Sequence, residues 1–175
     1  MRIKVNISII ILFAVLIMKP DYSCAQKFSK DEIKTAFVHN FIRFVNWPIE
    51  KKSLTLGVIG TNEFTKVLKS RLAGQKVGAR NLNIKQLSAS DGYDDCDALY
   101  ITNSKEVNFN GVLQKIKGKT ILSIAEIEGF CVKGGIVNLV EGTNGNYLFQ
   151  INQQRALEEK IHISSKLLKL AIQVK

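Results

Sequence analysis

Residues 54–60, of sequence LTLGVIG, form a mostly apolar run that predicts a buried β-strand. A helix is expected directly after this strand, because Thr61 or Asn62 can cap a helix that continues to about Leu72. The same alternation recurs along the chain, with further strands expected over residues 82–86, 96–101 and 120–124 and a further helix over residues 107–116. Strands that alternate with helices predict an α/β fold with a mainly parallel sheet flanked by helices.

Another helix is expected before the first strand, over residues 29–46. Its start carries a capping box, since Ser29 is followed three positions later by Glu32, and its apolar residues recur at helical spacing. Pro48 should end this helix, because the residue before a proline is displaced from helical backbone angles. Trp47 is therefore expected at the helix exit.

The C-terminal part of the sequence has a different pattern. Two β-type runs, residues 135–140 and 146–151, flank a Gly-Thr-Asn-Gly turn at residues 142–145. An Asn-Gly step between apolar runs is a strong signal for a hairpin. We therefore expect a C-terminal antiparallel hairpin at the edge of the sheet, followed by short helices that Asn152 and Ser164 can cap.

The beginning of the chain has the three parts of a secretory signal. Arg2 and Lys4 give a basic start, residues 7–18 are almost purely apolar, and small residues follow at the cleavage site, Ser23-Cys24-Ala25. The apolar run is shorter than the roughly 20 residues that span a bilayer, and an uncleaved membrane anchor is the alternative. We expect residues 1–25 to be removed as a signal peptide and residues 26–175 to form a single domain in the periplasm.

The amino-acid composition excludes several classes of protein. The chain has 175 residues, of which 46% are hydrophobic and 23% charged, and this balance excludes a disordered chain and a multi-span membrane protein. The formal net charge is +10, and its cations are scattered along the sequence. Because an exported protein rarely meets nucleic acid, a solvated basic surface explains this charge better than nucleic-acid binding does, and an acidic partner or anionic lipid is the alternative.

The sequence contains no recognisable catalytic constellation. It has no nucleophile motif of the kind found in serine hydrolases and no complete phosphate-binding loop. His39 and His162 have no second ligand at metal-binding spacing. We therefore expect no catalytic residue, no metal and no cofactor, and a binding protein rather than an enzyme.

Three cysteines are too few for a disulfide scaffold, and signal cleavage would remove Cys24. Cys96 precedes one predicted strand, whereas Cys131 lies well past the end of the next. Neighbouring parallel strands place those points at opposite ends of the sheet, while a disulfide needs Cα atoms within about 7 Å. Cys96 and Cys131 are therefore not expected to form a pair.

Residues 34–48, KTAFVHNFIRFVNWP, resemble the opening helix of the YfiR-like family of exported bacterial regulatory proteins. The block ISSKLL at residues 163–168 resembles the closing motif of the same family. Weaker similarities lie in the same order between these two blocks, at residues 56–60, 76–82, 96–101, 129–135 and 149–152. The resemblance covers nearly all of residues 26–175.

This resemblance implies a periplasmic regulator without enzymatic activity. In the family, such a regulator represses a membrane-bound diguanylate cyclase by binding its periplasmic part, which lowers cyclic-di-GMP signalling, and members can form homodimers. The family cysteine that matches Cys131 is bonded to a second cysteine seven residues later, but that position is Asn138 here. The redox-sensing feature of the family is therefore not carried over to this chain.

Two functional hypotheses follow. In the first, the protein binds a membrane-bound signalling protein through apolar anchors, for which we single out Trp47, Pro48, Ile49 and Phe130. Trp47 could instead belong to the core. The edge of the hairpin is a further candidate surface, because an unpaired strand edge accepts a partner strand, and Gln150 and Arg155 are expected near it.

The second hypothesis is a periplasmic small-ligand sensor that acts with a membrane histidine kinase. Open α/β sheets bind ligands at the carboxyl ends of their parallel strands. Gly60, Thr61 and Asn62 follow the first strand and would line such a pocket.

Overall fold

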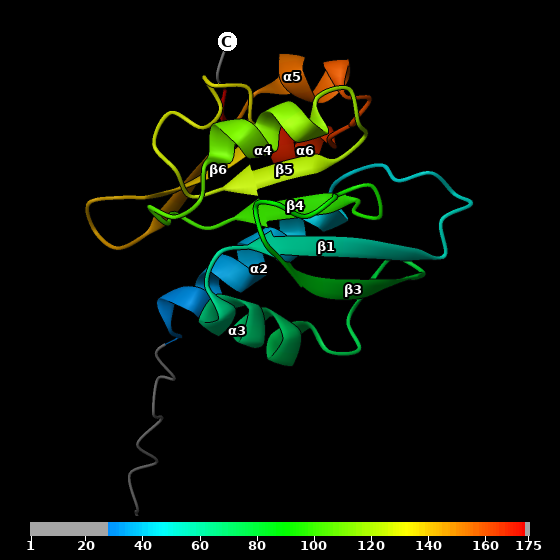
Figure 1. Ribbon diagram of the computed structural model, residues 1–175, viewed down its shortest axis with the longest axis horizontal. Helices are drawn as coiled ribbons and strands as arrows, with labels where there is room; N and C mark the ends of the chain where they lie inside the picture. The colour runs from blue at the N-terminus through cyan, green and yellow to red at the C-terminus, as the bar shows by residue number, and fades with distance from the viewer. Residues whose placement is uncertain (1–27, 174–175) are drawn as a thin grey trace, which may run out of the picture.

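The computed structural model describes residues 28–173, which form an eight-stranded sheet with helices on both faces (Figure 1). The strand order is β2-β3-β1-β4-β5-β6-β7-β8. The strands are β1 (Ser53–Ile59), β2 (Lys76–Val77), β3 (Arg80–Leu87), β4 (Ala98–Ile101), β5 (Leu122–Ala125), β6 (Val137–Glu141), β7 (Tyr147–Ile151) and β8 (Ile172–Gln173). The helices are α2 (Lys30–Arg43), α3 (Asn62–Leu72), α4 (Phe109–Ile116), α5 (Gln153–Glu158) and α6 (Ser165–Leu168). The expected signal peptide, residues 1–25, lies outside the described residues.

The strand pairings confirm the predicted fold class. β3, β1, β4, β5 and β6 run parallel to one another, and β6 and β7 form the predicted antiparallel hairpin near one edge. Two short strands complete the sheet and were not predicted: β2 pairs antiparallel with β3, and β8 pairs parallel with β7. Among the helices of residues 28–173, none combines the length and the apolar character needed to cross a membrane.

The capping box predicted for the first helix is present. Ser29 Oγ accepts a hydrogen bond from the Glu32 amide at 3.2 Å, and Glu32 Oε2 accepts one from the Ser29 amide at 2.7 Å. The helix ends at Arg43, however, rather than at residue 46. Its exit is redirected before Pro48, because Val45 forms a β-bridge with Ile163. A contact from the far end of the chain therefore ends this helix earlier than the proline signal predicts.

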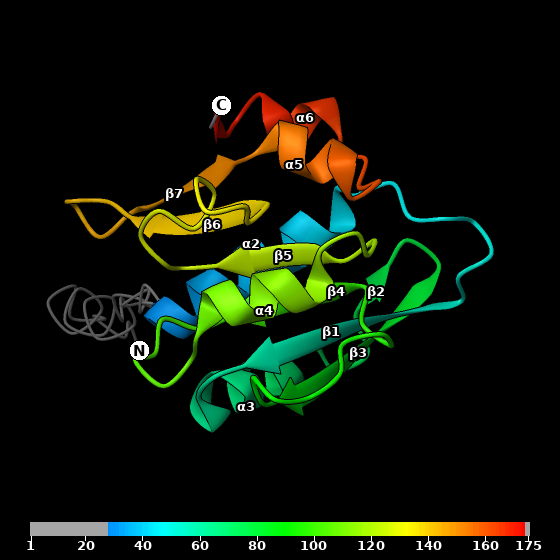
Figure 2. The ribbon, with the colours of Figure 1, turned by 45° about the horizontal axis from the view of Figure 1, so that its top comes forward.

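Two hydrophobic clusters lie on the two faces of the sheet. Tyr100 of β4 packs with residues of α2 and α3, whereas its neighbours Leu99 and Ile101 pack with residues of α4. Figure 2 shows α4 in front of the sheet and α2 behind it. Because side chains alternate between the faces of a strand, the fully buried strand β4 contributes to both clusters.

Candidate functional site

The segment between α2 and β1, residues 44–52, extends outward at the side of the molecule where β1 begins (Figure 1, cyan). Ile49 lies in this segment with 91% of its surface exposed, and Pro48 beside it is also exposed. Trp47 differs, since it is only 8% exposed and its Nε1 donates a hydrogen bond to the Ile42 carbonyl at 2.8 Å. Trp47 therefore lies in the core, which was the alternative considered for it. Pro48 and Ile49 form the exposed tip of the loop.

Hydrogen bonds from several parts of the chain fix this loop. Nη2 of Arg80 donates to the carbonyl oxygens of Trp47, at 3.2 Å, and of Pro48, at 2.8 Å. The Asn46 amide donates to the His162 carbonyl at 2.9 Å. A loop that is already ordered loses less conformational entropy when it binds a partner, so the tip suits recognition.

The second half of the loop is tied to the start of β4. The amide of Lys51 donates to the Pro48 carbonyl at 3.3 Å and closes a turn around Ile49. The ammonium group of Lys51 forms an ion pair with Asp97, whose other carboxylate oxygen accepts a hydrogen bond from the Thr55 amide at 2.8 Å. Asp97 is buried, so it holds the loop against the sheet.

Phe130 does not offer a surface to a partner, which corrects the prediction that it is an apolar anchor. Its ring is fully buried against Gly135 and 6.0 Å from the ring of Phe109, measured between centroids. In the same loop Val132 is 77% exposed. Both residues are apolar, and the sequence pattern could not show which of them packs inward.

Gln150 and Arg155 are half-buried and engaged with neighbours. Oε1 of Gln150 accepts a hydrogen bond from Nδ2 of Asn138 at 3.3 Å. Arg155, on α5, forms ion pairs with Glu158, at 3.4 Å, and with Glu159. A role of Gln150 and Arg155 at an interface stays a prediction.

A crevice of about 450 Å³ lies where β1, β3 and β4 end. Gly60 and Thr61 line it, together with residues 86–89 and with Ser104, Glu106 and Val107. The chain leaves β1 through α3 on one face of the sheet and leaves β4 through α4 on the other, so the crevice lies at the point where the strand order reverses. Such points are the usual ligand sites of open α/β sheets. Asn62 is the first residue of α3.

One backbone position beside the crevice requires glycine. Gly60 has a φ of +134°, and a Cβ there would lie 1.6 Å from Oγ1 of Thr102. The Gly60 carbonyl accepts a hydrogen bond from Nε2 of Gln86 at 3.1 Å. Thr61 is the N-cap of α3, and within the described chain its side chain makes no capping hydrogen bond.

The two cysteines of the described chain are free and buried. The Sγ atom of Cys131 lies 3.6 Å from the Ile136 carbonyl oxygen and 3.7 Å from that of Gln150. Burial raises the pKa of the Cys131 thiol to about 11, and burial also raises the pKa of Cys96. Neither thiol is in the ionised form that reacts with oxidants or alkylating agents at neutral pH.

We expect Cys96 and Cys131 to resist iodoacetamide at pH 8 in the folded protein. A pKa of about 11 leaves on the order of one Cys131 thiol in a thousand ionised at that pH. Mass spectrometry should therefore show almost no labelling of either residue, and full labelling of both in guanidinium chloride. Rapid labelling of the folded protein, or a peptide that links Cys96 to Cys131, would contradict this picture.

The two histidines do not belong to a metal site within the described residues. Within residues 28–173, no group of three or more His, Cys, Asp or Glu side chains could hold a metal ion. His162 is exposed, and His39 lies half-buried in a groove between α2 and α3. The positioning roles of Arg80 and Asp97 were not predicted, and the glycine–arginine segment at residues 76–82 was the nearest signal for Arg80.

Comparisons with known proteins add a family and a fold. A family model described as YfiR/HmsC-like matches residues 31–172. A crystal structure of a conserved domain protein from Vibrio cholerae is similar, with a TM-score of 0.61 and 14% identity over 85% of this chain and 61% of that one. The ABC domain in complex with L-Trp from Streptococcus pneumoniae gives a TM-score of 0.56 and 13% identity over 83% of this chain and 60% of that one.

At these identities, the two solved structures support the fold alone. The chain spans only about 60% of the length of either protein. No curated protein matches the sequence.

Proposed function

The chain belongs to the YfiR/HmsC-like family, and from this premise we propose that it represses a membrane-bound signalling enzyme by binding the periplasmic part of that enzyme. The family suggests a regulatory periplasmic protein in cyclic-di-GMP signalling. A diguanylate cyclase is therefore the proposed target. Residues 1–25 would direct export and be removed, which leaves residues 26–175 as a single domain, either alone or as a homodimer.

The observation that carries this proposal is the family match over residues 31–172, which includes nearly the whole described domain. The exposed loop tip supports a binding mechanism. Pro48 and Ile49 are apolar and exposed, while Glu50, Lys51 and Lys52 follow as a polar rim. An apolar centre with a polar border is the usual arrangement of a protein interface.

Ile49→Ser is expected to weaken repression. A central apolar anchor contributes about 2 kcal/mol or more to binding, so its loss should reduce affinity for the target by about thirtyfold. The test measures cellular cyclic-di-GMP in a strain that lacks the gene and carries either the native chain or a variant. The native chain should lower the cyclic-di-GMP level, and Ile49→Ser should fail to do so at an equal amount of protein.

Val132→Ser is the matched control, because Val132 is also an exposed β-branched residue but lies in a different loop. This variant should lower cyclic-di-GMP as the native chain does. If the native chain itself leaves the level unchanged, the proposed target is wrong. If Ile49→Ser acts as well as the native chain, the loop tip is not the binding surface.

A second candidate function is a small-ligand sensor that works with a membrane histidine kinase. The crevice lined by Gly60 and Thr61 favours it, because its volume of about 450 Å³ and its place at the reversal of strand order are those of a ligand site. Ile49→Ser leaves this crevice intact. Kinase-dependent signalling that is insensitive to this variant would favour the sensor function over repression through the loop.

A further inference from the structure

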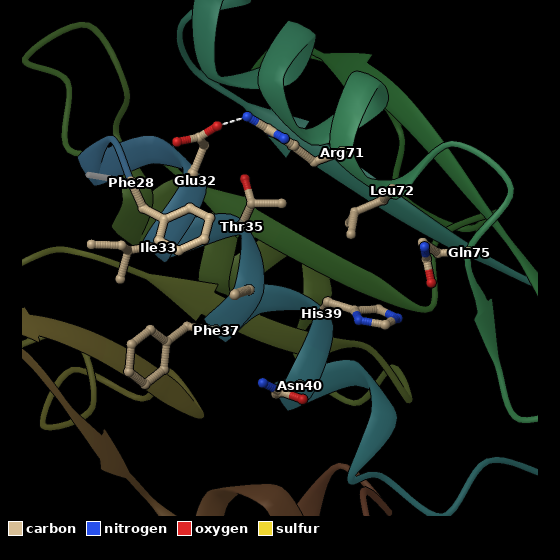
Figure 3. A pocket seen from close by; sticks show the side chains of 11 residues that line it. Phe28, Glu32, Ile33, Thr35, Phe37, His39, Asn40, Arg71, Leu72 and Gln75 are labelled. Carbon is tan, nitrogen blue, oxygen red and sulfur yellow. Dashed lines mark ion pairs between the residues drawn. The ribbon is translucent and has the colours of Figure 1, made fainter. Parts of the chain in front are cut away.

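A groove of about 450 Å³ lies between α2 and the C-terminal end of α3, apart from both the loop tip and the crevice (Figure 3). Its walls are mainly apolar and include Phe28, Ile33, Phe37 and Leu72. Pockets of this size and character hold small molecules in other proteins, usually with a few polar groups that fix the orientation of the ligand.

Two polar atoms in this groove have no hydrogen-bond partner in the described chain. They are Oγ1 of Thr35 and Nε2 of His39. Thr35 is only 2% exposed, so its hydroxyl group has little access to water as a hydrogen-bond partner. The two residues are four positions apart on α2, and side chains at that spacing are neighbours on one face of a helix. An unpaired buried polar atom is costly, and a ligand that pairs with it recovers that cost.

The charge of the groove selects an uncharged ligand. Glu32 and Arg71 form an ion pair across the opening, so neither charge is free to attract an ion (Figure 3). Burial lowers the pKa of His39 and Arg43 reinforces this shift, although the nearby Lys76 backbone opposes it. The imidazole ring is therefore neutral at neutral pH. A hydroxyl group can donate or accept, so it can pair with Thr35 and with either tautomer of His39.

We propose that this groove binds a small uncharged amphiphile, with an apolar body against the α2 and α3 walls and a hydroxyl group at Thr35 and His39. The site is separate from the loop tip of the proposed function, and the binding test below does not depend on any partner protein.

The first experiment measures binding of N-phenyl-1-naphthylamine, an uncharged apolar dye, to the purified protein by fluorescence. Saturable binding is expected. Ala36→Phe should abolish it, because Ala36 lies in the groove and is exposed, so that a larger side chain fills the space without disturbing the core. Ala79→Phe is the matched control, since Ala79 is an exposed residue in the turn between β2 and β3. That variant should bind the dye as the native protein does.

The second experiment tests the hydrogen bonds by competition. The competitors are 4-propylphenol and 4-propylanisole, which differ in that the anisole lacks the hydroxyl proton. The phenol should displace the dye at a concentration about fivefold lower, which corresponds to one ordinary hydrogen bond. Thr35→Val should remove most of this preference and leave the thermal midpoint unchanged or higher, because the hydroxyl group it deletes has no partner in the described chain.

Three outcomes would overturn the proposal. They are dye binding that survives the Ala36→Phe substitution, equal displacement by the two competitors in the native protein, and a self-association that Ala36→Phe abolishes. The last result would make the groove a contact between two copies of the chain. Thermal midpoints of all variants show whether each one is folded, and Thr35→Val keeps the test decisive if Ala36→Phe is unstable.

Discussion

Trp47→Ala is expected to lower the free energy of unfolding by about 3–5 kcal/mol, the usual cost of deleting a large buried aromatic side chain. The indole ring of Trp47 is 8% exposed and belongs to the cluster beneath α2 and α3. Its deletion leaves a cavity and removes the hydrogen bond from Nε1 to the Ile42 carbonyl. Urea unfolding, followed by far-ultraviolet circular dichroism, measures the change.

Trp47→Phe separates packing from partner contact. It keeps an aromatic ring and loses the indole N–H, so its cost should be nearer 1–2 kcal/mol, and regulation should persist. Trp47→Ala should release the target only through loss of folded protein. If Trp47→Ala proves as stable as the native chain and still releases the target, Trp47 contacts the partner directly, as the sequence first indicated.

Local patterns in the sequence were sufficient for most of the fold. The capping box at Ser29 and Glu32 involves residues three apart, and the hairpin turn at residues 142–145 lies between the strands it joins. The buried strands β1, β4 and β5 are mostly apolar runs. In each case the residues that signal the element lie within the element or next to it, so the sequence can show it.

Features that depend on distant contacts could not be predicted in the same way. The end of α2 is set by pairing between Val45 and Ile163, which are separated by most of the domain. Strand β8 has only two residues and exists because it pairs with β7. No periodic pattern marks so short a strand, and its formation depends on a neighbour already in place.

The same distinction separates the site residues that the sequence predicted from those that it missed. Pro48 and Ile49 were predicted, together with Trp47, as apolar anchors at the exit of the first helix, and both of them are exposed. Arg80 was not predicted, since its role is to bind carbonyl groups of a loop more than thirty residues earlier. The groove between α2 and α3 likewise joins residues from two separate helices, and neither helix alone has a ligand motif.

Phe130→Ala is expected to cost about 3–5 kcal/mol of unfolding free energy, an effect comparable with that of Trp47→Ala. Phe130 is fully buried, and its backbone carbonyl accepts a hydrogen bond from the Gly135 amide at 2.9 Å. The ring and this bond together fix the loop that leads into the hairpin. Phe130→Leu should cost less, because leucine fills much of the same space. Urea unfolding of both variants tests the difference.

The contact between Phe130 and Gly135 can be tested by a double-mutant cycle. A Cβ atom at position 135 would lie 2.1 Å from Cε1 of Phe130, so Gly135→Ala forces the ring to move and should cost about 2–3 kcal/mol. In a Phe130→Ala background the same methyl group enters the cavity left by the ring, and its cost should nearly vanish. The resulting coupling of about 2 kcal/mol is typical of residues in direct contact.

Additive costs in this double-mutant cycle would show that the ring does not lie against Gly135. Phe130 would then be free to turn outward, and its rejection as a partner contact would be wrong. A large coupling, together with normal cyclic-di-GMP control by a folded Phe130→Leu variant, would leave the loop tip at Ile49 as the apolar surface through which this domain binds its target.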